Sequence, residues 1–105
     1  MTNIKYSPKE CSITFKGHSG YAEIGKDIVC AGISSLFFAL YRSLHDRGIV
    51  SFADLNSSEG YAQIRAYPSA KERHTCVVMF ETIITGLELM AQNYPDYVKI
   101  DKEEN

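Results

Sequence analysis

The chain has 105 residues, of which 45% are hydrophobic and 11% aromatic, and its net charge is −2 at pH 7. This length predicts one domain near the small end of what folds alone, a limit that a homodimer would relieve. A near-neutral charge argues against a nucleic-acid-binding role, which needs a basic face. No run reaches the roughly 18 apolar residues of a membrane span, and the N-terminus lacks the apolar stretch of a signal peptide, so we expect a cytoplasmic protein without a membrane partner.

Residues 3–6 and 11–17 are predicted to form two strands, because apolar residues occupy every second position from 11 to 15. The proline-containing segment 8–10 between them suits a hairpin turn. Residues 17–26 follow with three glycines and no periodic pattern. This composition predicts a mobile loop, with residues 19–26 poorly ordered in the free protein.

A helix is predicted to begin after Asp27, which is a good N-cap, and to end before Gly48 in the C′ position. Its apolar residues recur at helical spacing and form one face: Val29, Ile33, Leu36, Phe37, Leu40 and Leu44. Phe38 and Tyr41 add apolar surface beyond that face. We therefore expect this helix to lie close to a homodimer interface.

Ile49–Leu55 and Tyr61–Tyr67 are predicted to be two further strands, joined by a turn at residues 56–60. A second helix is predicted from Ala70 to Asn93. Its expected buried face consists of Cys76, Phe80, Ile83, Leu87, Met90 and Tyr94.

The last predicted element is an edge strand at Tyr97–Ile100, followed by a solvated tail at residues 101–105. The order of strands and helices predicts an α/β fold of the α+β type. We expect a single small domain over residues 1–105, with a mixed β-sheet of about five strands packed against two helices.

The three cysteines are Cys11, Cys30 and Cys76, and no Cys-x-x-Cys pair occurs, so neither a disulfide framework nor a usual zinc signature is indicated. Cys30 lies in the first turn of the first predicted helix. The unpaired N–H groups there favour a thiolate and could form an oxyanion hole. His18, at the end of a strand beside the loop, is the candidate general base.

Structural roles compete with each of these assignments. Taken singly, a cysteine in an apolar helix or a histidine in a loop is more often structural than catalytic. Asp27 is more readily explained as a helix cap than as a third catalytic member. A metal site built from His18, Cys30, His74 and Cys76 lacks any known ligand spacing.

Two neighbouring segments resemble the ribosomal-processing cysteine protease family, Prp. Gly17–Ala22 reads GHSGYA where the family has a GHAGYA-like block, and Asp27–Ser34 reads DIVCAGIS where it has a DIVCAAVS-like helix start. The departures are Ser19 and Gly32 in place of alanine and Ile33 in place of valine. None of them removes a reactive group.

The resemblance implies a cytosolic homodimeric cysteine endopeptidase that needs no cofactor. It implies that the substrate is the precursor of a large-subunit ribosomal protein, number twenty-seven, whose short N-terminal leader is removed. At the matching positions Cys30 is the nucleophile and His18 the base, and Asp27 is a nearby acid whose role stays open.

The same resemblance implies that the loop at residues 19–26 becomes ordered over substrate. The candidate substrate-binding residues lie in the loop and the helix start: Gly17, Ser19, Gly20, Tyr21, Ala22, Gly25 and Ser34. Family substrates carry a Phe-Phe pair just before the cut, which needs an apolar pocket. Phe37, Phe38 and Tyr41 are candidates to line it.

Two other functions fit the same residues. One is a non-enzymatic, dimeric, ribosome-associated binding module with this fold, and the other is a protease that acts on phage capsid precursors. A thiol-redox protein is a third alternative, but no resolving cysteine lies near Cys30 in the sequence.

Overall fold

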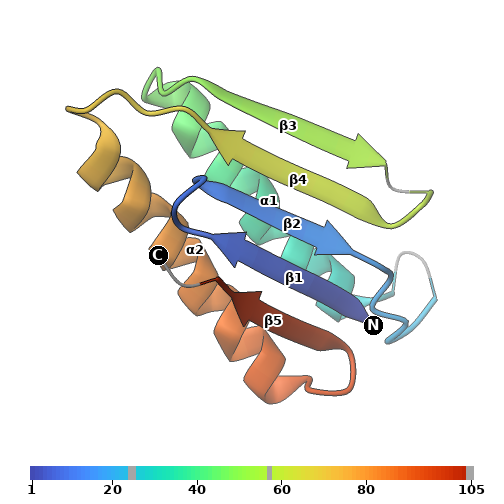
Figure 1. The fold of residues 1–105 in the computed structure, drawn as a ribbon. Helices are drawn as coiled ribbons and strands as arrows, with labels where there is room; N and C mark the ends of the chain where they lie inside the picture. The colour runs from blue at the N-terminus through green and yellow to red at the C-terminus, as the bar shows by residue number, and fades with distance from the viewer. Residues whose placement is uncertain (24–25, 57, 104–105) are drawn as a thin grey trace.

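The computed structural model describes residues 1–23, 26–56 and 58–103. They form one five-stranded mixed sheet and two helices (Figure 1), which confirms the predicted fold class. The elements in chain order are β1 (Thr2–Ser7), β2 (Ser12–Lys16), α1 (Ile28–Asp46), β3 (Ser51–Asn56), β4 (Tyr61–Ala66), α2 (Arg73–Asn93) and β5 (Val98–Lys102). The strand order is β3-β4-β2-β1-β5, and neighbours are antiparallel except for the parallel pair β1 and β5.

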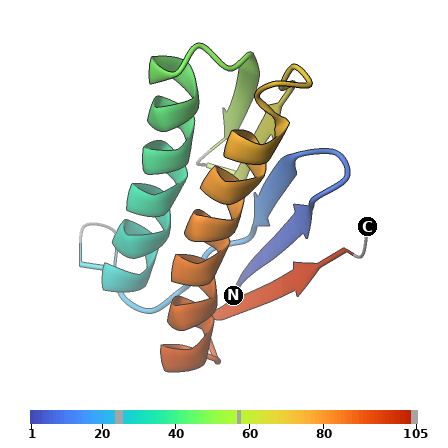
Figure 2. The same cartoon turned by 90° about the vertical axis from the view of Figure 1, so that its left-hand side faces the viewer.

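Both helices lie side by side on one face of the sheet, so the molecule has two layers (Figure 2). The core lies between these layers. Five side chains of α1 are buried in it, Val29, Ile33, Phe37, Leu40 and Leu44, and each belongs to the predicted apolar face. By length and composition, both helices are long and apolar enough to span a membrane. Here both helices bury an apolar stripe against the sheet.

The buried stripe of α2 differs from the predicted face. It consists of Cys76, Phe80, Ile84 and Leu87, whereas the predicted Ile83, Met90 and Tyr94 are half-buried. Ile83 lies beside Leu40 of α1, in the groove between the two helices. Because α2 contacts both the sheet and α1, its apolar surface is wider than a single stripe.

The ends of α1 are where the local signals placed them. The Asp27 carboxylate accepts a hydrogen bond from the Cys30 amide at 2.9 Å, which is the N-cap geometry. Gly48 has a φ of 71°, the left-handed conformation that favours glycine after a helix.

The predicted strand from residue 11 begins one residue later. Cys11 has a φ of 51° and its amide donates to the Pro8 carbonyl at 3.3 Å, so it closes the hairpin turn instead of opening β2. The predicted strand from Ile49 likewise begins at Ser51, since residues 49–50 belong to the connection from α1.

The second helix and the last strand are also displaced from their predicted bounds. Residues 69–72 form a separate turn before α2, in which the Ser69 amide donates to the Glu72 carboxylate at 2.8 Å and the Ser69 hydroxyl accepts from the Glu72 amide at 3.3 Å. The last strand runs to Lys102, and the Glu103 amide donates to the Tyr6 carbonyl at 2.8 Å. The predicted solvated tail from residue 101 was therefore wrong for its first residues, because they pair with β1.

Candidate active site

The candidate site forms where β2 ends, β4 begins and α1 starts. Antiparallel pairing of β2 with β4 sets Lys16 opposite Tyr61, and beyond that pair the Gly17 amide donates to the Gly60 carbonyl at 2.7 Å. His18 is the next residue along the chain. The sheet therefore carries the histidine to the same end of the molecule as the first turn of α1, which holds Cys30.

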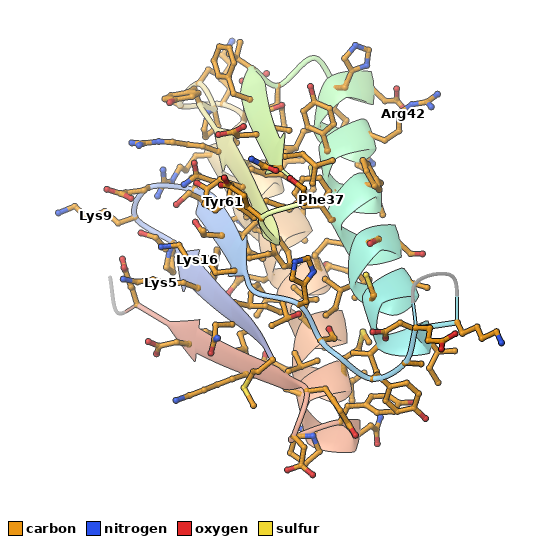
Figure 3. All side chains as sticks on the ribbon, turned by 90° about the vertical axis from the view of Figure 1, so that its right-hand side faces the viewer. Lys5, Lys9, Lys16, Phe37, Arg42 and Tyr61 are labelled. Carbon is orange, nitrogen blue, oxygen red and sulfur yellow. The ribbon has the colours of Figure 1, made fainter. Side chains whose placement is uncertain are left out.

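His18 and Cys30 line the same cavity, which has a volume of about 140 Å³. Ser19 and Ser34 add polar atoms to its wall. Its apolar lining comes from both layers of the fold: Phe15, Ile33, Phe37, Phe38, Leu55 and Ala62. Phe37 extends from α1 toward the sheet (Figure 3), and its ring meets that of Phe15 edge to face at 5.6 Å.

The three cysteines lie in different environments. Cys30 is exposed, whereas Cys11 and Cys76 are buried, at 3% and 0% exposure. Burial and, to a smaller extent, the neighbouring Cys11 thiol raise the pKa of Cys76 to about 11, so this thiol is protonated at neutral pH. Of the three, Cys30 alone combines solvent access with a place in a cavity that a histidine also lines.

The Asp27 cap pairs one N–H group in the first turn of α1. The Cys30 amide donates to the Asp27 carboxylate, whereas the Ala31 amide makes the first intrahelical bond, to the Asp27 carbonyl at 3.0 Å. The Cys30 amide is thus already paired. An oxyanion hole that uses the Cys30 amide would therefore require this cap to open.

Asp27 joins the helix to the preceding loop. One carboxylate oxygen accepts from the Cys30 amide, and the other accepts from the Tyr21 amide at 3.2 Å. Both of these contacts are to the backbone. The observed geometry is that of a cap that also fixes the end of the loop.

Asp27→Ala should therefore lower the free energy of unfolding by about 1 kcal/mol through the lost cap, with little effect on the rate of the folded fraction. Asp27→Asn is the matched control, because its amide oxygen still accepts from the Cys30 amide. Urea denaturation and peptide cleavage measure the two effects. A rate loss far greater than the unfolded fraction accounts for would assign Asp27 a catalytic role through His18.

The loop after His18 has more anchors than its composition indicated. Ser19 is 6% exposed, and its hydroxyl is hydrogen-bonded to that of Thr2 at 2.8 Å. The Tyr21 ring meets the rings of Tyr94 and Tyr97 edge to face, at 5.6 and 5.2 Å. These contacts tie residues 19–21 to β1 and to the segment between α2 and β5.

The candidate substrate-binding residues fall into three groups. Gly17, Ser19 and Ser34 line the cavity with His18 and Cys30. The cavity lining does not include the three loop residues Gly20, Tyr21 and Ala22. Gly25 lies outside the described residues.

Tyr41, a candidate for the apolar pocket, does not line the cavity, whereas Phe37 and Phe38 do. The residues proposed for a metal site do not come together. Cys76 is buried in the core, and His74 is exposed on the first turn of α2, so neither lines the cavity.

Sequence reasoning missed several lining residues that come from β1, β3 and β4: Thr2, Leu55, Gly60, Tyr61 and Ala62. All of them except Thr2 belong to a strand or turn that was predicted, so the pattern of elements was available. What was not available was the strand order, which brings β4 next to β2.

Comparison with known proteins gives a consistent result. The family model described as cysteine protease Prp matches residues 1–99. The ribosomal processing cysteine protease Prp of Mycoplasma genitalium is 30% identical over 105 residues, covering 95% of this chain and 96% of that protein. The protein of the same name from Bacillus subtilis is 27% identical over 93 residues, covering 85% and 82%.

Solved structures share the fold. The chain is similar to the crystal structure of an essential ribosomal processing protease Prp from S. aureus in complex with a covalently linked product peptide, with a TM-score of 0.85, 18% identity, and coverage of 98% of this chain and 100% of that one. It is also similar to SMU.848 from Streptococcus mutans, with a TM-score of 0.79, 26% identity, and coverage of 99% and 93%. Because the family model matches residues 1–99 of its 105, this chain belongs to the ribosomal processing cysteine protease family, Prp.

Proposed function

We propose that this chain is a cytoplasmic cysteine endopeptidase that removes the short N-terminal leader from the precursor of a large-subunit ribosomal protein, number twenty-seven. Cys30 acts as the nucleophile and His18 as the general base. The observation that carries this proposal is that His18 and an exposed Cys30 line one largely apolar cavity.

The chemistry requires the side chains of Cys30 and His18, a peptide substrate and a water molecule. The Cys30 sulfur attacks the scissile carbonyl carbon, and the His18 imidazole takes the thiol proton. The same proton passes to the leaving amine as the C–N bond breaks, which leaves a thioester on Cys30. Water then attacks the thioester, His18 takes a proton from it, and the free thiol and a carboxylic acid are released.

The shape of the cavity supports a substrate with an aromatic side chain beside the cut. A cavity of about 150 Å³ lined by aliphatic and aromatic side chains can hold a benzene molecule, and this one has a volume of about 140 Å³. Phe15, Phe37 and Phe38 supply aromatic surface at its wall. Substrates of the family carry a Phe-Phe pair just before the cut, and the cavity has room for one of those two rings.

The test is to incubate the purified protein with the leader-bearing ribosomal precursor and to read the product masses. The matched substrate has both phenylalanines before the cut replaced by alanine. We expect one cut in the first substrate and loss of most cleavage in the second. An intact precursor after prolonged incubation with folded protein would contradict the proposal, and cleavage of a phage capsid precursor alone would redirect it.

Thiol labelling separates the protease from the non-enzymatic ribosome-associated module. At neutral pH we expect iodoacetamide to modify Cys30 rapidly and Cys76 very slowly, because burial raises the pKa of Cys76 to about 11. Intact mass and peptide mapping identify the modified residue. Cys30 that reacts no faster than the thiols of the unfolded chain would favour the binding module.

We also propose a homodimer with α1 close to the interface. Phe38 of α1 and Leu55 of the edge strand β3 are 51% and 54% exposed, which leaves apolar surface that a second copy would cover. Sedimentation at micromolar concentration should give the mass of a dimer. Phe38→Lys should favour the monomer, and Leu89→Lys on α2, at a site of matching 54% exposure, should not. A wild-type protein that sediments only as a monomer would contradict this prediction.

A further inference from the structure

The backbone around His18 is held at three successive residues. The Gly17 amide donates to the Gly60 carbonyl at 2.7 Å. The His18 carbonyl accepts from the Met1 amino group at 2.5 Å, and the Ser19 hydroxyl pairs with that of Thr2 at 2.8 Å. The segment is therefore fastened to the start of β4 on one side and to the start of β1 on the other.

The imidazole of His18 lies against Gly60. A β-carbon added at Gly60 would be 2.9 Å from Nε2 of His18 and 3.0 Å from the carbonyl carbon and oxygen of Gly17. The separation from Nε2 is closer than real β-carbon contacts, and the two separations from Gly17 are at their tight limit, so at least one partner would have to move. The Gly17 backbone is held by the bond to Gly60, whereas the imidazole is exposed and can rotate.

We propose that Gly60 is a positioning residue for His18: the bare α-carbon at the start of β4 leaves the space that the imidazole occupies beside the cavity. This inference rests on the proposed role of His18 as the general base. A side chain at Gly60 displaces the imidazole, and its close approach to the Gly17 carbonyl also presses on the backbone that carries His18. A misplacement of about 1 Å in a catalytic group can cost on the order of 10²-fold in rate.

A second reason for glycine at this position must be separated from the first. Gly60 has a φ of 64°, a conformation that other residues adopt only with strain. Gly48 provides the matched control, because its φ is 71° and a β-carbon there would meet no atom within 4 Å. Gly48→Ala therefore imposes a similar backbone cost without the contacts to His18 and Gly17.

The experiment compares Gly60→Ala, Gly60→Asn and Gly48→Ala. Asparagine tolerates a positive φ better than alanine but still carries a β-carbon, so Gly60→Asn keeps the test valid if Gly60→Ala unfolds. Peptide cleavage gives kcat and KM, thermal unfolding gives Tm, and the ¹H–¹⁵N signals of the imidazoles report each histidine directly. His74, exposed on α2, serves as the internal reference.

Both Gly60 variants should lower kcat by about 10- to 100-fold with a much smaller change in KM. They should also shift the imidazole signals of His18 while those of His74 stay in place. Gly48→Ala should have a lower Tm than the wild type but a kcat within about twofold of it. Folded Gly60 variants with the kcat and the His18 signals of the wild type would overturn the proposal.

A wild-type protein that cuts no leader peptide would overturn the proposed function instead. The imidazole signals need no substrate, so they would still decide whether Gly60 positions His18. Signals of His18 that move equally in Gly48→Ala and Gly60→Ala would attribute the effect to backbone strain and reject the contact.

Discussion

Cys30→Ala should yield a folded protein with no measurable peptide cleavage. Among the described residues that line the cavity, the substitution removes the only sulfur, and a methyl group cannot replace it as a nucleophile. The cost to folding should be small, because Cys30 is exposed and the amide that bonds to Asp27 is retained. Mass spectrometry of the precursor peptide measures cleavage, and circular dichroism checks the fold. A folded Cys30→Ala protein that cuts at the wild-type rate would end the cysteine-protease mechanism.

The other two thiols provide controls for this prediction. Cys76→Ala should retain substantial activity but lower the free energy of unfolding by about 1 kcal/mol or more, because Cys76 is fully buried and its loss leaves a small cavity. Cys11→Ala should also retain activity. It removes the sulfur that accepts a hydrogen bond from Arg73 at 3.2 Å, at the end of the sheet away from His18. Loss of cleavage in either variant beyond the loss of folded protein would implicate a second thiol.

The first helix was predictable because its signals are local. Asp27 as the cap, the apolar positions at helical spacing and Gly48 at the end all lie within the helix or next to it, and the structure has the predicted bounds. The second helix was less predictable at its start. Ser69 and Glu72 form two reciprocal hydrogen bonds, each between a backbone amide and the other residue's side chain. The turn that these bonds stabilise competes with an earlier start of the helix.

The two candidate catalytic residues could be named from the sequence, but their surroundings could not. Cys30 and His18 are reactive types at recognisable positions, a helix start and a strand end. Gly60 gave no such signal, because it was one residue of a predicted turn 42 positions away from His18. Its importance arises only from the pairing of β4 with β2, which brings Gly60 next to Gly17. Contacts between distant segments depend on strand order, and periodicity within a segment does not determine that order.

The structure explains why serine is accommodated at position 19, where the family pattern has alanine. The family block has alanine there, and the sequence alone gave no use for the hydroxyl. In the fold the Ser19 hydroxyl is buried and paired with that of Thr2, so a polar group that would be costly without a partner has one. This pair helps to hold the segment that carries His18.

His18→Ala should lower the cleavage rate by roughly 10²–10⁴-fold, because a positioned general base contributes about that much. The loss should be smaller than for Cys30→Ala, since the Cys30 sulfur is still present to attack the peptide. The fold should be retained, because the hydrogen bonds from this segment to Met1 and Gly60 are made by backbone atoms of residues 17 and 18, which alanine keeps. Single-turnover cleavage of the precursor peptide measures the effect over this range.

His74→Ala is the matched control, because it removes an exposed imidazole from the start of α2 and should leave the rate unchanged. Adding free imidazole extends the test. The side chain deleted in His18→Ala leaves space beside the cavity, so millimolar imidazole should restore part of the rate in that variant and none in Cys30→Ala. Restoration would attribute the lost rate to the missing base, since a general disturbance of the fold would not respond to imidazole. Wild-type cleavage by a folded His18→Ala protein would instead require another group to take the proton from Cys30.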